Sequence, residues 1–312
     1  MASILTFIRR AAPAAPATDT AALARMMQDC SIEVMPRTAA KIDDFRALLP
    51  AGTRVYVAHI DGTPFADVLA TARRLTGEGF AAVPHVAARG IADAAELEAR
   101  LAALAEAGVS RALVIAGGID TPRGCFTDSL QLLRTGLFDR YGFTDLFVAG
   151  HPEGSRDIDP DGSDRAVMEA ARWKSAFAER TDARMAMTTQ FCFDAGPVIA
   201  WVNRLKAEGV NLPVHIGVAG PAKLQTLIKF AISCGVGPSL KVLQKRAMDV
   251  TKLLLPYEPT DFLTELAAHK AAHPDFGIEQ VHFFPLGGIK TNAQWVTDNG
   301  GAAGVPASKQ QG

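Results

Sequence analysis

The sequence predicts an α/β protein folded as a single (β/α)8 barrel of the TIM type. Eight strand-like runs alternate with helix-like segments along the chain. Most of these runs are continuously apolar, as expected of parallel strands buried on both faces of a sheet. A doubly wound sheet is the alternative, but it usually has about five or six strands. When such a sheet binds a dinucleotide it carries a Gly-x-Gly-x-x-Gly turn after its first strand, and the sequence has none there. Eight units therefore favour the closed barrel.

The expected strands are short and rich in apolar residues. They span residues 31–35, 54–58, 81–85, 111–116, 145–149, 184–191, 213–217 and 280–284. Helices are expected where apolar residues recur at helical spacing. They span residues 20–28, 37–48, 64–75, 93–107, 129–138, 166–179, 195–208, 221–233, 240–250, 260–271 and 292–298. Pro36 ends the first strand, and Thr38 is a candidate cap for the helix that follows. The helices 240–250 and 260–271 have no strand of their own, so we expect extra helices between the seventh and eighth strands.

Composition and charge limit the class of function. The chain has 312 residues, of which 48% are hydrophobic and 21% charged, values that suit one large globular domain. The formal net charge is −1 and no basic block is present, so no nucleic-acid partner is expected. No run approaches the ~18 apolar residues of a membrane span, so no membrane contact is expected either. The four cysteines are widely spaced, which argues against zinc and disulfides and predicts a cytoplasmic protein.

Three parts are expected along the chain. Residues 1–19, with their Ala/Pro tract, are predicted to form a flexible N-terminal arm. Residues 20–300 are predicted to form the catalytic barrel, and residues 301–312 a flexible C-terminal tail.

Polar residues gather at the predicted carboxyl ends of the strands, where barrels of this kind bind their ligands. Glu33 lies between Ile32 and Val34, so its side chain is expected to point into the barrel mouth. Burial there would raise its pKa and suit it to proton transfer. Gln190 lies near the carboxyl end of the sixth strand, where a buried amide is costly without a partner. A structural bond from Gln190 to neighbouring backbone is the alternative.

Histidines and glycines follow several other strands. His59, His85 and His151 come after the second, third and fifth strands, and each could also be a capping or packing residue. His59, Asp61 and His85 are capable of binding a metal, but their spacing matches no known ligand motif, so no metal site is expected. Gly-Gly pairs after the fourth and eighth strands could present backbone amides to a phosphate.

Several segments together resemble the methylenetetrahydrofolate reductase family, in its order and at about its spacing. They are Ser31-Ile-Glu-Val-Met-Pro-Arg-Thr38, Val83-Pro-His85, Gly150-His-Pro-Glu-Gly154, Thr189-Gln-Phe-Cys-Phe-Asp194 and Phe284-Pro-Leu-Gly-Gly288. The likeness runs from about Ser31 to Trp295 and lacks the regulatory domain that some members append. It implies a (β/α)8 barrel that reduces methylenetetrahydrofolate to methyltetrahydrofolate, usually with FAD relaying a hydride from NADH or NADPH.

The resemblance also implies roles for individual residues. Glu33 would be the acid that protonates the folate and opens its methylene bridge as an electrophilic iminium. Gln190 would hold the folate, and Phe230 would stack against the folate or the nicotinamide. His85 and His151 would line the flavin.

Other positions depart from the family pattern. The family's fourth strand commonly ends in Gly-Asp or Gly-Gly-Asp, whereas here one residue separates Gly118 from Asp120. Asp120 remains the candidate for the aspartate near the pterin and flavin, with Gly118 beside the cofactor. His59 stands where a small hydroxyl residue is frequent and would also line the cofactor. The family's Ala-Gly-Ala turn before the sixth strand is missing, and Arg172 and Lys174 are the candidate partners of the FAD phosphates; a solvated helix face is the alternative.

The sequence leaves several alternatives open. A flavin-free enzyme could pass hydride directly from NADH to the folate iminium, and the reaction could run in reverse as an oxidation of methyltetrahydrofolate. A non-catalytic folate-binding barrel is the alternative from another class. The choice between NADH and NADPH and the existence of a homo-oligomer are also open.

Overall fold

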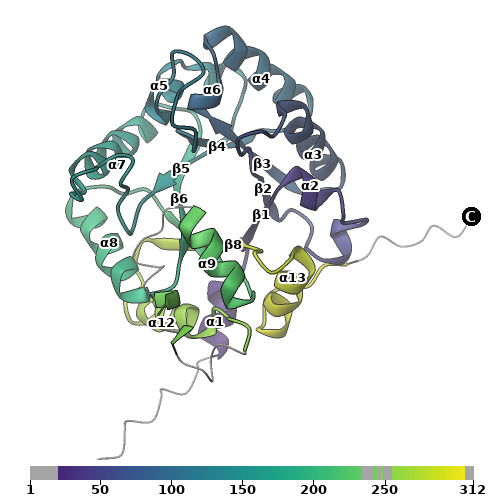
Figure 1. Cartoon of the computed structure of the whole chain (residues 1–312), viewed down its shortest axis with the longest axis vertical. Coiled ribbons are helices and arrows are strands. Elements are labelled where there is room, and N and C mark those ends of the chain that lie inside the picture. The colour runs from purple at the N-terminus through teal and green to yellow at the C-terminus, as the bar shows by residue number, and fades with distance from the viewer. Residues whose placement is uncertain (1–19, 234–241, 245–246, 249–254, 306–312) are drawn as a thin grey trace, which may run out of the picture.

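The computed structural model describes residues 20–233, 242–244, 247–248 and 255–305. Its centre is a closed barrel of eight parallel strands, in which the first strand pairs with the last (Figure 1). The strands are β1 (Ser31–Val34), β2 (Arg54–Val57), β3 (Ala81–Ala87), β4 (Arg111–Ile115), β5 (Asp145–Gly150), β6 (Arg184–Cys192), β7 (Val214–Ala219) and β8 (Ile278–Phe284). The prediction of a (β/α)8 barrel is therefore confirmed.

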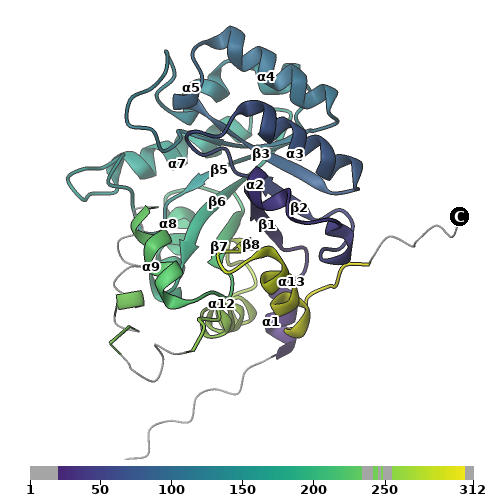
Figure 2. The ribbon, with the colours of Figure 1, turned by 45° about the vertical axis from the view of Figure 1, so that its right-hand side comes forward.

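Helices form a ring around the strands. They are α1 (Thr20–Met26), α2 (Pro36–Ala39), α3 (Phe65–Gly77), α4 (Ala94–Glu106), α5 (Ser129–Arg134), α6 (Leu137–Arg140), α7 (Arg165–Ala178), α8 (Ala195–Ala207), α9 (Leu224–Ser233), α12 (Thr260–Ala272) and α13 (Ile289–Asp298). As expected, α12 is an extra helix between β7 and β8, and it packs against α1 (Figures 1 and 2). Of the predicted helix 240–250, only residues 242–244 and 247–248 lie within the described part of the chain. Within that described part, no helix is both long and apolar enough to cross a membrane.

Two predicted helices are broken. The segment 37–48 contains α2 and then a separate 3-10 turn, η1 (Phe45–Ala47), which begins where the Asp44 side chain accepts the Arg46 N–H. The segment 129–138 is divided into α5 and α6 at Gly136, whose φ of 69° is left-handed and ends the first helix. The candidate cap Thr38 lies inside α2, where its hydroxyl accepts the Met35 N–H and so caps the helix start.

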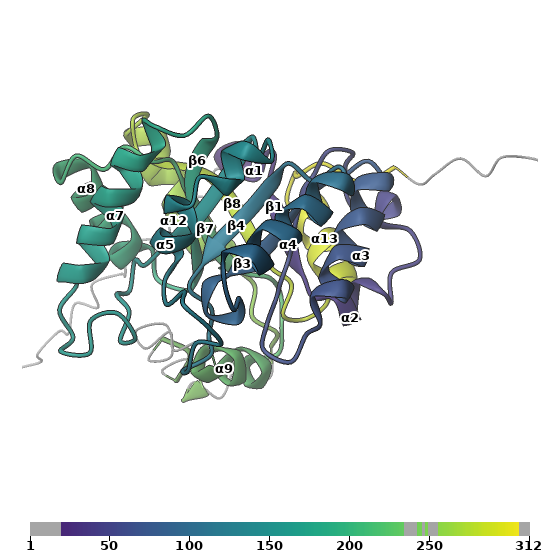
Figure 3. The same ribbon diagram turned by 90° about the horizontal axis from the view of Figure 1, so that it is seen from above.

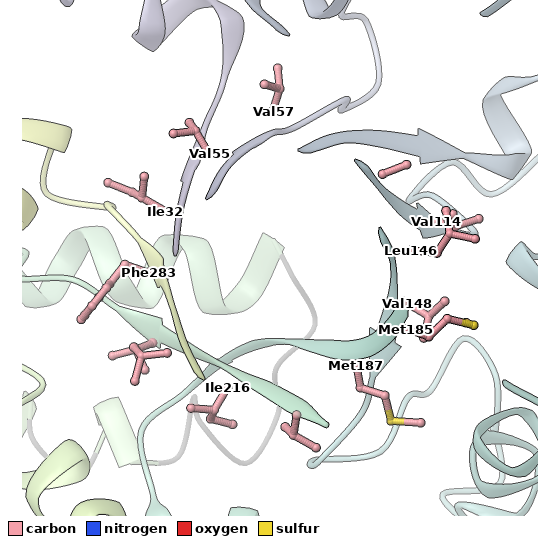
Figure 4. Close-up of a cluster of buried hydrophobic side chains, with 14 of the residues drawn as sticks. Ile32, Val55, Val57, Val114, Leu146, Val148, Met185, Met187, Ile216 and Phe283 are labelled. Atoms are coloured by element: carbon pink, nitrogen blue, oxygen red, sulfur yellow. The ribbon is translucent and has the colours of Figure 1, made fainter. Parts of the chain in front are cut away.

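Alternation along the strands separates two sets of buried side chains. Outward-facing residues pack under the helices; they include Ile32, Val55, Val57, Val114, Leu146, Val148, Met185, Met187, Ile216 and Phe283 (Figure 4). A smaller set fills the inside of the barrel and includes Tyr56, Val83, Leu113 and Phe147. Burying each large apolar side chain contributes about 1.5–3 kcal/mol. Because Ile32 faces the helices, Glu33 beside it must face the barrel interior.

Candidate functional site

A large cavity opens at the carboxyl-terminal ends of the strands. Its volume is about 1400 Å³. A pocket for one drug-sized ligand usually measures about 300–1,000 Å³. Helix α9 borders this cavity and lies at one end of the barrel (Figure 3). The mouth is therefore large enough for two ligand bodies.

Glu33 lies at the base of this cavity between two histidines. Its Oε2 is 3.2 Å from Nε2 of His85 on β3 and 3.8 Å from Nε2 of His282 on β8. The order of the strands brings these three side chains together. β1 pairs with β8, and only β2 lies between β1 and β3. The Glu33 side chain keeps 19% of its surface exposed, which leaves it in reach of a ligand.

The pKa of Glu33 differs from the sequence-based expectation. Burial raises it, as expected, but the charge of His85 and the nearby imidazole of His282 outweigh burial and lower the pKa to about 2. The expectation of a raised pKa is therefore wrong. Glu33 alone is a carboxylate at neutral pH, and an imidazole 3.2 Å away can hold the proton that an acid-catalysed step needs.

Sequence reasoning missed His282 as a partner of Glu33. Its side chain is fully buried, its Nδ1 lies 2.9 Å from Ser31 Oγ, and the Tyr56 ring packs 4.3 Å away between centroids. Burial lowers the pKa of His282 and the Glu33 charge opposes this. The available signal was a polar residue at an inward position of an apolar strand, the same signal that identified Glu33.

Gln190 reaches the cavity through an irregularity in β6. The register between β6 and β7 shifts between Thr188 and Phe191. The Thr189 hydroxyl accepts the Gly217 N–H at 2.8 Å and donates to the Gln190 carbonyl at 2.8 Å. A Cβ on Gly217 would lie only 2.4 Å from that carbonyl oxygen, so glycine is required there. The bulge leaves the Gln190 side chain exposed in the cavity wall.

Aromatic residues form the wall beside Gln190. Phe230 on α9 is half-buried, lines the cavity and packs against a cluster that contains Phe191, Phe193 and Phe284. This wall offers a flat apolar surface for a ring system.

Lys174 is a buried cation in the cavity wall, beside the end of β5. It is 4% exposed, and its Nζ donates to the Ala149 carbonyl at 2.8 Å. Burial lowers its pKa to about 8, against the attraction of Asp128. Among the described residues no carboxylate forms an ion pair with it. Burial, helped by the Lys174 charge, also lowers the pKa of His151 to about 4, so that imidazole is neutral.

Two of the candidate residues are not brought to the cavity. Arg172 lies two positions before Lys174 on α7, so it faces another direction, and its guanidinium pairs with Glu208 at 2.8 Å. Asp120 is exposed in the loop after β4 and does not line the cavity, although Gly118 does. One residue separates Gly118 from Asp120, and this places the Asp120 carboxylate beyond the cavity lining.

His59 lines the cavity after β2. Its Nε2 lies 3.0 Å from the Thr63 carbonyl, and burial lowers its pKa. The proton on Nε2 is donated to that carbonyl, which leaves Nδ1 as an acceptor.

Arg89 is a second residue that sequence reasoning missed. Its guanidinium pairs with Asp157 at 2.9 Å and donates to the carbonyls of Thr127 at 3.0 Å and Ile119 at 3.4 Å. It therefore ties together the loops after β4 and β5 at the cavity mouth. β3 runs to Ala87, beyond its predicted end at residue 85, and this brings Arg89 to the rim.

Three further cations line the mouth near β1 and β8: Arg37, Lys41 and Lys290. None of the described carboxylates pairs with them. No group of three His, Cys, Asp or Glu side chains in the described ranges is arranged to hold a metal ion.

Comparison with known proteins supports the fold. No protein-family model matches the chain. A solved structure, an uncharacterized protein from Clostridium thermocellum that binds two copies of 5-methyl-5,6,7,8-tetrahydrofolic acid, superposes with a TM-score of 0.52. The similarity covers 88% of this chain and 96% of that chain at 9% sequence identity. The shared property is the barrel.

Proposed function

We propose that the chain is a folate-dependent oxidoreductase that interconverts 5,10-methylenetetrahydrofolate and 5-methyltetrahydrofolate with NADH or NADPH. The observation that carries the proposal is Glu33, held between His85 and His282 at the base of a cavity that also presents Gln190. The resemblance to the methylenetetrahydrofolate reductase family implies that Glu33 and Gln190 act on the same folate. The fold of a protein that binds a methyltetrahydrofolate supports it further.

Proton transfer is the task of the Glu33–His85 pair in this proposal. A proton delivered to the bridging amine nitrogen of the folate breaks one C–N bond of the methylene bridge and leaves an iminium at the other nitrogen. A hydride added to the iminium carbon then gives the methyl group. Glu33 and His85 move the proton. Gln190 holds the amide edge of the folate ring system, and Phe230 packs on its face.

The tail of a folate carries glutamate carboxylates, which need cationic partners. Arg37, Lys41 and Lys290 line the same mouth and are available for them. This directs the tail across the ends of β1 and β8, away from Lys174.

The residues near Lys174 fit a phosphate-bearing cofactor such as FAD. A buried ammonium that pairs with no described carboxylate suits a phosphate oxygen, and neutral His151 and His59 with Gly118 can approach a flavin closely. When bound, the flavin would accept a hydride from the nicotinamide and pass it to the folate. Lys174 would hold the phosphate, and His59 would accept a hydrogen bond through Nδ1.

Direct hydride transfer without flavin is the second candidate. It is favoured by the absence of Arg172 and Asp120 from the cavity lining and by a volume of about 1400 Å³, which admits a nicotinamide and a folate together. The visible absorption of the purified protein separates the two. Flavin bands near ~450 nm with folate-dependent NADH oxidation support the relay, and a colourless protein that turns over without added FAD supports direct transfer.

Glu33→Gln tests the assignment of the acid. We expect kcat to fall by about 10²–10⁴-fold while methyltetrahydrofolate still binds, because the amide keeps the shape and loses the proton-accepting oxygen. Glu106→Gln, an exposed change on α4, is the matched control and should leave kcat unchanged. Unchanged turnover in Glu33→Gln would remove the acid assignment. Folate binding without turnover in the wild-type protein, even with FAD supplied, would favour a non-catalytic folate-binding barrel.

A further inference from the structure

A second cavity lies at the opposite, amino-terminal end of the strands. Its volume is about 380 Å³, within the usual range of small-molecule sites. Arg54, Arg111 and Arg184, which line it, are the first residues of β2, β4 and β6. The folate chemistry proposed above uses none of them.

The three arginines share one layer of the barrel. Side chains in a layer come from alternate strands, and β2, β4 and β6 are alternate strands. The remaining even-numbered strand, β8, contributes Gln280 to the layer. The Oε1 of Gln280 accepts a hydrogen bond from Arg54. Three of the four even strands thus place a guanidinium in this layer.

Charge in this layer is unbalanced. Asp145, which is buried and begins β5, lies 3.2 Å from Arg111 and 2.6 Å from Arg184 and so is shared between two cations. The hydrogen-bond partner of Arg54 is a neutral amide, and no described carboxylate lies within ion-pair distance of its guanidinium. Among the described residues that line the cavity, Asp29 is the only carboxylate, against three guanidinium groups. Clustered guanidiniums in a partly buried cavity favour an anionic partner.

The walls of the cavity are packed against other parts of the fold. Leu49, Phe283 and Val296 supply apolar surface, and Asn292 supplies an amide. One side is closed by residues 301–305, which contribute Ala302. Their backbone approaches η1 so closely that a Cβ on Gly304 would lie 2.4 Å from the Arg46 carbonyl oxygen. The cavity therefore has an apolar wall and a cationic floor.

We infer that this cavity is a binding site for a small organic anion, one that carries a carboxylate or phosphate group on a short apolar body. The anionic group contacts Arg54 and Arg184, and the apolar body lies against Phe283 and Val296. Bidentate hydrogen bonds from guanidinium to an oxyanion give the site its selectivity for anions over neutral analogues.

Calorimetric titration of the full chain with glycerol phosphate and with succinate tests the site, in a buffer free of other oxyanions. We expect saturable binding of one molecule per chain for at least one of the two, and the tighter ligand identifies the group as phosphate or carboxylate. Succinamide, a neutral analogue of succinate, should not bind. Arg54→Gln and, separately, Arg184→Gln should each weaken binding about tenfold or more, because each removes a charged hydrogen-bonding group. Arg184 is 81% exposed, and in its variant the buried Asp145 keeps Arg111 as a partner, so we expect Arg184→Gln to fold even if Arg54→Gln does not.

Arg165→Gln is the matched control. Arg165 is 83% exposed, pairs with Asp161 and lies outside the cavity, so this change should leave the affinity unaltered. No saturable binding of either anion to the wild-type chain would overturn the inference, as would equal affinities in wild type, Arg54→Gln and Arg184→Gln. The titration uses no folate and no nicotinamide, so its result is independent of the proposed oxidoreductase activity.

Discussion

Replacing Lys174 with methionine tests whether the buried amine serves a ligand rather than the fold. Burial lowers the pKa of Lys174 from 10.5 to about 8. At about 1.4 kcal/mol per pKa unit, the charged amine costs the folded state about 3 kcal/mol at neutral pH. Methionine removes this cost but leaves the Ala149 carbonyl without its donor, which costs about 1–3 kcal/mol. We therefore expect Lys174→Met to unfold with a free energy equal to that of wild type or up to ~2 kcal/mol higher.

The direction of the Lys174 pKa shift determines how the stability difference between the two proteins changes with pH. The pKa of Lys174 in the folded state is below its unfolded value, so the unfolded chain binds more protons between about pH 8 and 10.5. The contribution of Lys174 to stability consequently rises with pH through that window. Any stability advantage of the methionine variant should shrink by about 3 kcal/mol as the pH rises from 8 to 10.5. Urea denaturation at neutral pH and near pH 10 measures the difference, with Lys206→Met, an exposed change on α8, as the control.

The same variant should lose affinity for phosphate-bearing ligands. We expect binding of FAD or ADP to weaken about tenfold or more, because a buried ammonium is lost from the wall that would hold a phosphate. Two results would refute the reasoning. One is a variant destabilised by more than ~1 kcal/mol at neutral pH; the other is unchanged affinity for both ligands.

Three further changes test other parts of the site. Gly217→Ala should destabilise the protein by about 1–3 kcal/mol in urea denaturation and raise KM for the folate, because its Cβ would push against the Gln190 carbonyl; an unchanged KM would separate the bulge from folate binding. His282→Asn should lower kcat and shift the pH profile of kcat, since it removes one of two imidazoles facing Glu33; a lower Tm with an unaltered pH profile would leave His282 with a structural role only. Arg89→Gln should raise the proteolytic cleavage rate of the loops it ties while Tm changes little, and equal cleavage rates would contradict its clamping role.

The fold and the position of Glu33 could be predicted because both depend on local patterns. Continuous apolar runs define buried parallel strands, and alternation decides which side chain enters the barrel. The direction of the Glu33 pKa shift could not be predicted, because it depends on His85 and His282, which meet Glu33 only when the strands pair and the barrel closes. Burial was visible in the sequence and the opposing charges were not.

Helix boundaries and side-chain directions on α7 were harder to predict. Arg172 and Lys174 were both candidate phosphate partners, yet their two-residue spacing on α7 turns Arg172 toward Glu208 and Lys174 into the cavity. The break at Gly136 depends on a left-handed backbone, a conformation that a glycine permits but does not require. Tertiary packing decides whether the helix breaks at such a glycine.

Closing the barrel through β1 and β8 has a consequence for synthesis of the chain. Ser31 and His282 contact each other across a separation of 251 residues. At about 5–20 residues per second, the ribosome needs roughly 10–50 s after β1 to produce β8. Throughout that interval one edge of β1 lacks its native neighbour and can pair with other extended chains. We expect truncation before β8 to yield aggregating protein.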